Sequence, residues 1–423
     1  MRYLLLLFLA GMGTDVWAQV PDSVYTPNIL SAQLYLKGNQ LAYPIISVNG
    51  NEQLELSFDD LDGDYKPYYY TFQICNADWT PVEISTFDYI RGFAQNPITD
   101  YHYSSVALIR YTHYHVFLPE VSSHITLSGN YMVKVYLNND TSKIAFTKRL
   151  LVVQNAVAIS AQILTPMNPQ LFQTAQKLQF TVNSKSLSIS NPFQQIRVVV
   201  LQNNRWDNAI YMGKPSFYSG TNFVYNSDEV PVFPGGNQWR WLDLQSFRFQ
   251  SDRVAHVDYL PAGCVIFVKP DHERSHSPYY YYQDNNGQFF IQSSDLINPN
   301  WQGDYGRVRF VFVPPDNQPL EGRDLYILGA FTNYKLNDNF RMVYNASSGA
   351  YEGSALLKMG VYNYCYVTIN PNEAGAVPSF ELTEGNHLET ENNYNILVYY
   401  RSMGGRTDQL VGIYSANSMN SLR

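Results

Sequence analysis

The chain has 423 residues, with 28 Lys or Arg against 36 Asp or Glu, so its formal net charge is −8. This acidity argues against a nucleic-acid-binding protein, which needs a basic surface. With 35 Tyr, 23 Phe and 6 Trp, the chain is too aromatic to be disordered. Its length is enough for two to four domains, each with its own core.

The N-terminus has the pattern of an export signal. Arg2 precedes the apolar run YLLLLFLA at 3–10, and Ala18 is a small residue that suits cleavage before Gln19. We therefore predict a signal peptide at 1–18 and an exported mature chain. The run is shorter than the roughly 20 apolar residues that span a bilayer, and no later stretch approaches that length, so we expect no membrane span.

Alternation of polar and apolar residues predicts strands along the whole chain. In chain order, clear strand patterns lie at 53–58, 131–137, 196–201 and 307–313, and long helical patterns are absent. Clusters of Asn, Asp and Gly separate the strands, as at 59–64, 138–140 and 284–287. These patterns predict an all-β protein made of antiparallel β-sandwiches.

Two breaks in the chain predict three consecutive immunoglobulin-like β-sandwich domains. A last strand at 150–153 runs into a connector, and prolines 314, 315 and 319 interrupt the chain after the strand at 307–313. We expect an N-terminal sandwich at 19–155, a second at 156–313 and a C-terminal one at 314–423. Short, stiff linkers predict a fairly rigid rod.

The expected C-terminal domain carries two further motifs. Residues 325–334 (LYILGAFTNY) are a strand ending in a turn, and residues 360–367 (GVYNYCYV) alternate with Tyr on one face. They resemble early-set immunoglobulin-like modules related to glycogen-binding domains. Ala330 and Tyr334 stand where those modules have the acid and the stacking tryptophan, which disfavours a sugar-binding surface. A periplasmic glycan-binding module protein remains the alternative function.

The three cysteines do not predict a disulfide framework. Cys75, Cys264 and Cys365 lie far apart, each within a strand pattern and one in each expected domain. None therefore has a partner in its own expected domain. We interpret them as buried thiols that act as small apolar residues.

A literal H-E-x-x-H stands at His272, Glu273 and His276. In zinc proteases this spacing works because a helix puts both histidines on one face, with the glutamate beside the metal-bound water. Pro270 and Pro278 bracket the segment too closely for such a helix. We therefore predict a solvated loop, and a hydrolase built on these residues would require stoichiometric zinc.

A second cluster, Asp59, Asp60, Asp62 and Asp64 with Gly63, is similar to a calcium loop. Its spacing departs from an EF-hand, in which a ligand stands at position 5, Gly at 6 and Glu at 12. The pattern favours a hairpin turn that needs no metal. Adventitious metal binding by this turn, or by the H-E-x-x-H loop, stays an open alternative.

A third cluster lies on one predicted strand. His113 and His115 share a face of it, with His102 nearby in the sequence. Two histidines without a third ligand are a weak metal signal, so we predict a half-buried, aromatic-rich strand. Nucleophile elbows, P-loops and G-x-G-x-x-G turns are missing from the sequence. We expect no enzyme, no catalytic residue and no cofactor.

Nine short motifs occur in a specific order and spacing, namely 68–79 (YYYTFQICNADW), 89–93 (YIRGF), 111–114 (YTHY), 128–131 (SGNY), 202–208 (QNNRWDN), 234–240 (PGGNQWR), 384–387 (EGNH), 391–394 (ENNY) and 398–401 (VYYR). Together they resemble the plug protein family of the type IX secretion system of the Bacteroidetes, over nearly all of the mature chain. The resemblance implies a non-enzymatic periplasmic protein that binds a giant outer-membrane β-barrel translocon and closes its periplasmic opening. It implies association with the outer membrane through this protein partner, as a monomer within the complex.

We expect the partner-binding surface to include the aromatic loop at 86–104. This loop carries Tyr89, Arg91, Phe93 and Tyr101. Tyr and Arg are enriched at binding hot spots, and the loop is too rich in them for a mere connector. The alternative is that the loop packs on its own domain.

Overall fold

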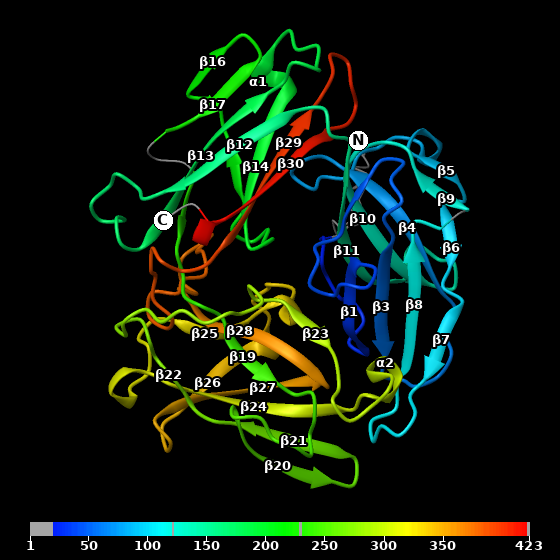
Figure 1. Ribbon diagram of the computed structural model, residues 1–423. Coiled ribbons are helices and arrows are strands. Elements are labelled where there is room, and N and C mark those ends of the chain that lie inside the picture. The colour runs from blue at the N-terminus through cyan, green and yellow to red at the C-terminus, as the bar shows by residue number, and fades with distance from the viewer. Residues whose placement is uncertain (1–19, 121, 228–230, 421–423) are drawn as a thin grey trace, which may run out of the picture.

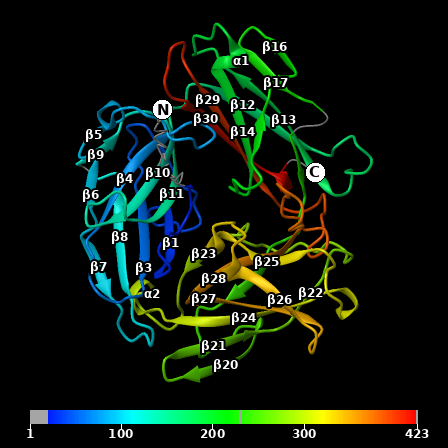
Figure 2. The same cartoon turned by 180° about the vertical axis from the view of Figure 1, so that it is seen from behind.

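The computed structural model describes residues 20–120, 122–227 and 231–420, so the expected signal peptide at 1–18 lies outside the described residues. The fold is all-β. Strands form three groups, called here the first, second and third sandwich, which lie at the corners of a triangle (Figures 1 and 2). Among the described residues, no helix has the length and apolar character needed to cross a bilayer.

The first sandwich pairs a four-stranded sheet with a five-stranded one. The four-stranded sheet has the order β1 (Ile29–Leu36), β3 (Leu54–Asp60), β8 (Thr112–Leu118) and β7 (Asp100–Tyr103). The five-stranded sheet has the order β2 (Ile45–Ser47), β11 (Ile144–Val153), β10 (Gly129–Leu137), β4 (Tyr68–Cys75) and β6 (Gln95–Pro97). A separate ribbon joins β5 (Ile90–Gly92) to β9 (Ser123–Ile125).

The second sandwich is made of two chain segments far apart in sequence. One sheet has the order β12 (Ala158–Leu164), β13 (Ala175–Asn183), β17 (Asn222–Tyr225) and β16 (Phe217–Ser219), with β18 (Val232–Pro234) also paired to β13. The other sheet has the order β15 (Ile210–Met212), β14 (Ile196–Gln202), β29 (Asn393–Tyr400) and β30 (Gln409–Asn417). Strands from the C-terminal end of the described chain thus complete a sandwich that begins near residue 158.

The third sandwich is one sheet folded over on itself. Its strands follow the order β19 (Arg240–Asp243), β28 (Gly360–Ile369), β25 (Asp324–Leu328), β26 (Arg341–Asn345), β27 (Ala350–Lys358), β24 (Tyr305–Val313), β21 (Gly263–Val268) and β20 (Val254–Leu260). Two short strands, β22 (Asp271–His272) and β23 (Phe289–Ile291), pair with β24 and β28. Short helices are α1 (Pro192–Gln195) and α2 (Pro299–Gln302), and 3-10 turns are η1 (Thr86–Asp88), η2 (Pro315–Asn317), η3 (Ala330–Thr332), η4 (Asp338–Phe340) and η5 (Ser418–Asn420).

This connectivity differs from the expected three consecutive domains. β24 ends at Val313 and pairs with β27, so the expected boundary at 313–314 falls inside one sheet. The third sandwich, at 235–390, is inserted between the two segments of the second. The expected rod is also wrong, because the first and third sandwiches contact each other directly and close the triangle. Near 155, in contrast, β11 and β12 do belong to different sheets.

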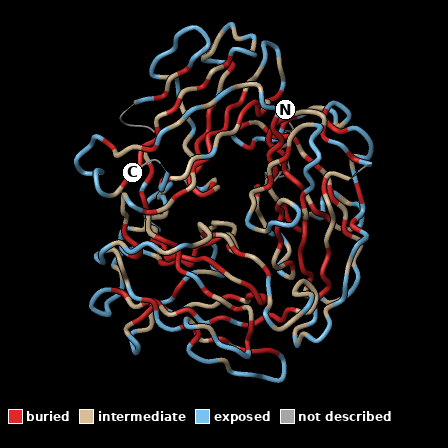
Figure 3. The backbone as a smooth tube through the Cα atoms, viewed as in Figure 1, coloured by how far each residue is buried: buried red, intermediate tan, exposed pale blue. Residues whose placement is uncertain are grey.

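Each sandwich has an apolar core between its facing sheets. The predicted tyrosine face of 360–367 points into the third core, where Tyr364 packs on Phe310 and Tyr366 on Phe312, with ring centroids 5.2 and 4.8 Å apart. Figure 3 shows buried segments along the strands and exposed segments at the outer loops. Period-two alternation therefore predicted correctly that these tyrosine side chains share one face of the strand.

The cysteines are free and buried, as predicted, but their distribution differs. Cys264 lies on β21 and Cys365 on β28, so both belong to the third sandwich. Burial raises the pKa of the Cys75 thiol to about 12 and that of Cys264 to about 11. These thiols are protonated at neutral pH and act as apolar core groups.

Candidate functional site

The expected partner-binding loop is split between the core and the surface. Tyr89 is only 2% exposed and lies in the first core, where its hydroxyl donates a hydrogen bond to the carbonyl of Phe72 (3.1 Å). It can offer no surface to a partner in this structure. Tyr101, on β7, is half-buried and packs on Tyr65 and Tyr114, with ring centroids 4.9 and 5.9 Å apart.

Arg91 and Phe93 lie on the exposed β5–β9 ribbon. Phe93 is 69% exposed, and Arg91 is exposed on β5. Gly92, between them, has φ of +103°, and a Cβ there would lie 2.0 Å from the carbonyl oxygen of Ser122. Only glycine lets the strand pass so close to its partner while both neighbours stay exposed. Figure 1 places β5 and β7 at opposite ends of the first sandwich, so Arg91 and Tyr101 do not share one patch.

The predicted histidine strand is β8, and the structure adds a carboxylate to it. Asp100 and His102 on neighbouring β7 lie opposite His115 and His113. His115 Nε2 is 3.1 Å and His102 Nε2 is 3.9 Å from the carboxylate of Asp100. Sequence reasoning missed Asp100, although the spacing Asp-x-His within one strand already puts the two side chains on one face.

His113 points into the junction between the first and third sandwiches. Its Nδ1 lies 2.7 Å from Asp59, which also accepts hydrogen bonds from Lys358 and from the hydroxyl of Tyr305 (2.6 Å). Burial disfavours the charge on Asp59, but Lys358 and His113 outweigh it and keep the Asp59 pKa below its ordinary value. Asp59 is therefore an ionised anchor for the third sandwich and does not belong to the group of turn carboxylates considered as an alternative calcium site.

The remaining aspartates of that turn surround the ammonium group of a lysine side chain. Asp60, Asp62 and Asp64 lie within metal-binding distance of one another. The ammonium group of Lys66 sits among them, 2.8 Å from Asp60 and 3.7 Å from Asp64, and it also pairs with Asp62. A lysine that fills this position supports the hairpin-turn interpretation over calcium.

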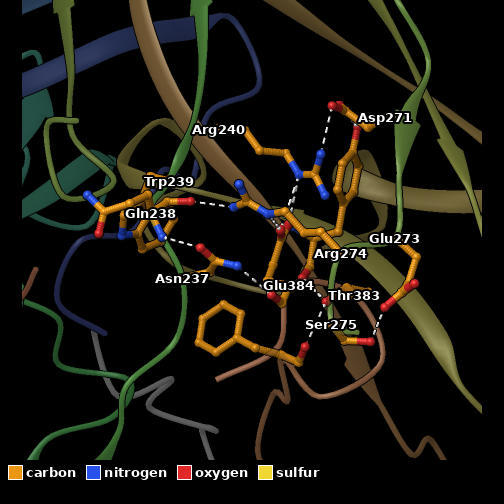
Figure 4. A network of polar contacts seen from close by, with 12 residues as sticks. Asn237, Gln238, Trp239, Arg240, Asp271, Glu273, Arg274, Ser275, Thr383 and Glu384 are labelled. Carbon is orange, nitrogen blue, oxygen red and sulfur yellow. Dashed lines mark hydrogen bonds and ion pairs between the residues drawn. The ribbon is translucent and has the colours of Figure 1, made fainter. Parts of the chain in front are cut away.

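The H-E-x-x-H segment carries no helix in the structure. His272 ends β22, and the following residues form a loop in which His276 is exposed and hydrogen-bonds to Glu273. Figure 4 shows that Arg274 of this loop, which is partly buried, points inward to Glu384 and to the carbonyl of Gln238. The segment is therefore fixed by its arginine, and its two histidines do not converge on a common point with the glutamate.

Arg274 belongs to a buried network that centres on Glu384 (Figure 4). Glu384 is 1% exposed and accepts hydrogen bonds from Arg240 Nε (3.0 Å) and from the backbone N–H of Tyr366 (2.9 Å). Burial opposes ionisation of Glu384, but Arg240 and Arg274 overcome it and lower its pKa. Asp271 accepts a further bond from Arg240 (2.9 Å). The network ties the turn at 380–387 to β19, β22 and β28 and contains no exposed reactive group.

The glycan-binding alternative depended on the turn that contains Tyr334. The guanidinium of Arg205, from the second sandwich, lies 5.5 Å from the centre of the Tyr334 ring, and Trp239 packs at its edge 6.1 Å away. The ring is thus engaged between the second and third sandwiches. This position has no free aromatic platform for a sugar.

A cavity of about 220 Å³ lies where the three sandwiches meet. Lys148 and Arg149 come from the first sandwich, Trp206 from the second and Lys335 from the third. Burial lowers the pKa of Lys335 to about 8 and also lowers that of Lys148. The ion pair of Arg149 with Asp22 balances part of this positive charge.

Comparison with known proteins found a matching family and similar solved structures. The family described as "Type 9 secretion system plug protein 1st domain" matches residues 29–154. A crystal structure of a hypothetical protein from Parabacteroides merdae is similar over 94% of this chain and 99% of that chain, with 31% sequence identity and a TM-score of 0.89. No curated protein matches the chain.

Proposed function

Through residues 29–154 the chain belongs to the type 9 secretion system plug protein family, and from this membership we propose that it is a non-enzymatic plug of the type IX secretion system. It binds a giant outer-membrane β-barrel translocon from the periplasmic side and closes the opening of the barrel. It reaches the outer membrane through this partner and acts as one copy within the complex. The family match of the first sandwich is the observation that carries the proposal.

The way in which the sandwiches are joined supports this role. A plug has to hold its shape against a wide pore. Trp79 of the first sandwich packs edge-to-face on Trp206 of the second, with ring centroids 4.9 Å apart. Asp59 pairs with Lys358 across the first and third sandwiches, and Arg205 lies over Tyr334 across the second and third. Each of the three sandwiches, which we propose to be immunoglobulin-like, is thus braced against both others.

We further propose that Arg91 and Phe93 belong to the contact with the translocon. Both are exposed at a ribbon that pairs with neither main sheet of the first sandwich, and Arg and aromatic side chains are enriched at binding hot spots. Tyr101 is a secondary candidate, because its side chain is only partly exposed.

The first experiment is affinity purification of the tagged chain from mildly solubilised envelopes of its native host, followed by mass spectrometry. Recovery of a very large outer-membrane barrel near equal stoichiometry supports the proposal. If the chain emerges alone from cells in which that barrel is abundant, the plug function is wrong.

The contact residues have a matched control within the chain. We expect Arg91→Ala with Phe93→Ala to weaken recovery of the barrel while the circular dichroism spectrum and melting temperature stay unchanged. Arg248 and Phe249 form a similarly exposed pair on the third sandwich, with the guanidinium 5.8 Å from the ring centre. Replacing this second pair by alanine should leave recovery intact. Equal recovery with both double variants would remove Arg91 and Phe93 from the interface.

A further inference from the structure

Three potential metal ligands lie together on one face of the first sandwich. Asp100 and His102 are two residues apart on β7, and His115 lies on β8 directly opposite Asp100. Side chains two residues apart on a strand, and pairs opposite each other on neighbouring strands, share one face of a sheet. Neither the plug function nor the buried contacts between sandwiches uses these three side chains as a set.

Their ligand atoms are spaced as a metal ion requires. His115 Nε2 lies 3.1 Å from one carboxylate oxygen of Asp100, and His102 Nε2 lies 3.9 Å from the other. One ligand atom from each residue lies within 4.8 Å of the other two. Zinc–ligand distances of about 2.0–2.2 Å place neighbouring ligands of a tetrahedron about 3.3–3.6 Å apart. Small side-chain rotations therefore suffice to bring all three onto one ion.

Packing already orients both imidazoles. The indole of Trp301, on α2 of the third sandwich, stacks on His102 with ring centroids 4.2 Å apart and planes 22° apart. Stacking covers the ring face and leaves Nε2, which lies in the ring plane, free to coordinate. His115 is largely buried beside His113 and Phe117, with ring centroids 6.0 and 5.7 Å away. Ligands on rigid, packed strands lose little conformational freedom on binding.

We propose that His102 Nε2, His115 Nε2 and the Asp100 carboxylate bind one zinc ion, with solvent completing its coordination. Two imidazoles and a carboxylate are a ligand set that Zn²⁺ accepts. His113 is left out because its ring nitrogens do not lie within 4.8 Å of the ligand atoms of all three residues. The side chain of Asp100 is 59% exposed, which gives the ion access from solvent. Because His102 also carries the Trp301 contact, the bound ion strengthens the junction between the first and third sandwiches.

The test is calorimetric titration of the mature protein, free of any histidine tag, with zinc chloride. We expect one equivalent of Zn²⁺ to bind and to raise the melting temperature, whereas Mg²⁺ does neither. Removing a residue that only hydrogen-bonds to a metal ligand typically lowers metal affinity about 10–100-fold. His115→Ala removes a ligand itself, so we expect it to lower the zinc affinity at least as much. The affinity for zinc should also fall at acidic pH, because protons compete with the metal ion for the imidazole nitrogens.

Two further variants make the result decisive. Asp100→Asn removes the charge at an exposed position and leaves the fold intact, and we expect a similar loss of affinity. His124→Ala removes an exposed histidine on β9 and should bind zinc as the unmodified protein does. Absence of stoichiometric binding, or equal affinity in His115→Ala, Asp100→Asn and the unmodified protein, overturns the proposal.

Discussion

Several charged side chains of this protein are buried at the contacts between sandwiches. Asp59 and Lys358 are each about 1% exposed, and they are paired with each other across the first and third sandwiches. An unpaired buried charge costs far more than the pair itself gains, because no water replaces the missing partner. Such pairs therefore make correct docking of the sandwiches specific, even where their net stabilisation is small.

The Asp59–Lys358 pair gives a direct prediction. Asp59→Asn leaves the Lys358 ammonium buried without a counter-charge, so we expect the free energy of unfolding to fall by about 3–5 kcal/mol in urea denaturation. Adding Lys358→Met should recover part of the loss. Asp64→Asn, at an exposed site in the same turn, should change stability by no more than about 0.5 kcal/mol. A loss as small as this for Asp59→Asn would contradict the role assigned to the pair.

His113 gives a pH dependence whose sign follows from its burial. Burial disfavours the imidazolium more than Asp59 favours it, so the folded-state pKa lies below the ordinary value of 6.5. The unfolded chain then binds more protons than the folded one, so this contribution to stability is present above pH 6.5 and is lost as the pH falls below it.

We expect the melting temperature of the unmodified protein to fall between pH 7 and 5. The melting temperature of His113→Asn should fall less steeply, since the amide can still donate to Asp59 without titrating. The control is His124→Asn, at an exposed site, which should keep the slope of the unmodified protein. Identical slopes for all three proteins would show that His113 does not cause the effect.

At the scale of elements, the turn at 380–387 is held by charges instead of by a strand ladder. Its carboxylate, Glu384, receives two guanidinium groups and a backbone N–H of β28. Gly385 has φ of +75°, and a Cβ there would lie 2.9 Å from the backbone of Ser275. The turn and the loop at 272–278 are therefore packed so closely that each fixes the other.

Glu384→Gln tests this arrangement. The amide keeps the shape of the side chain but leaves Arg240 and Arg274 without their shared counter-charge. We expect a loss of about 3–5 kcal/mol in unfolding free energy, and faster hydrogen exchange at the N–H of Arg274, which donates to Thr383. Glu381→Gln, exposed in the same turn, is the control and should alter neither measurement. Unchanged exchange in Glu384→Gln would mean that packing alone holds the turn.

At the scale of the whole molecule, the second sandwich depends on two segments that lie far apart in the chain. β14 pairs along its length with β29, about 200 residues later, and β30 completes the sheet. One face of β14 and β29 fills the second core through Val198 and Val398, and the other face packs on the first sandwich through Val199 and Leu397. Losing β29 and β30 would therefore open two interfaces at once.

Truncation separates this architecture from three consecutive domains. A chain that ends at residue 390 lacks β29 and β30, so we expect proteases to cut it within 156–234 while the first sandwich stays resistant. A chain that ends at residue 420 keeps both strands and should resist cleavage at 156–234. If the shorter chain were cut only after residue 313, the second sandwich would not need its C-terminal strands.

The local patterns of this sequence were enough to predict the all-β fold, the buried thiols, the loop at 272–276 and the shared face of Tyr362, Tyr364 and Tyr366. Alternation, turn residues and proline act over a few residues, so their effects can be read without the rest of the chain. The exposure of Arg91 and Phe93, in contrast with buried Tyr89, could not be read from the aromatic content of their loop.

The tertiary structure alone decided which strands pair and which charges meet. The apolar runs at 198–201 and 396–399 indicate strands buried on both faces, but such runs do not say with which strand they pair. Lys358 meets Asp59, and Asp100 meets His115, only because the sheets fold and dock as they do. Strand order, the inserted third sandwich and the closed triangle arise from burial and hydrogen bonding between distant segments. A local pattern specifies how much of a strand is buried, and the identity of its neighbour is fixed only when the whole chain has packed.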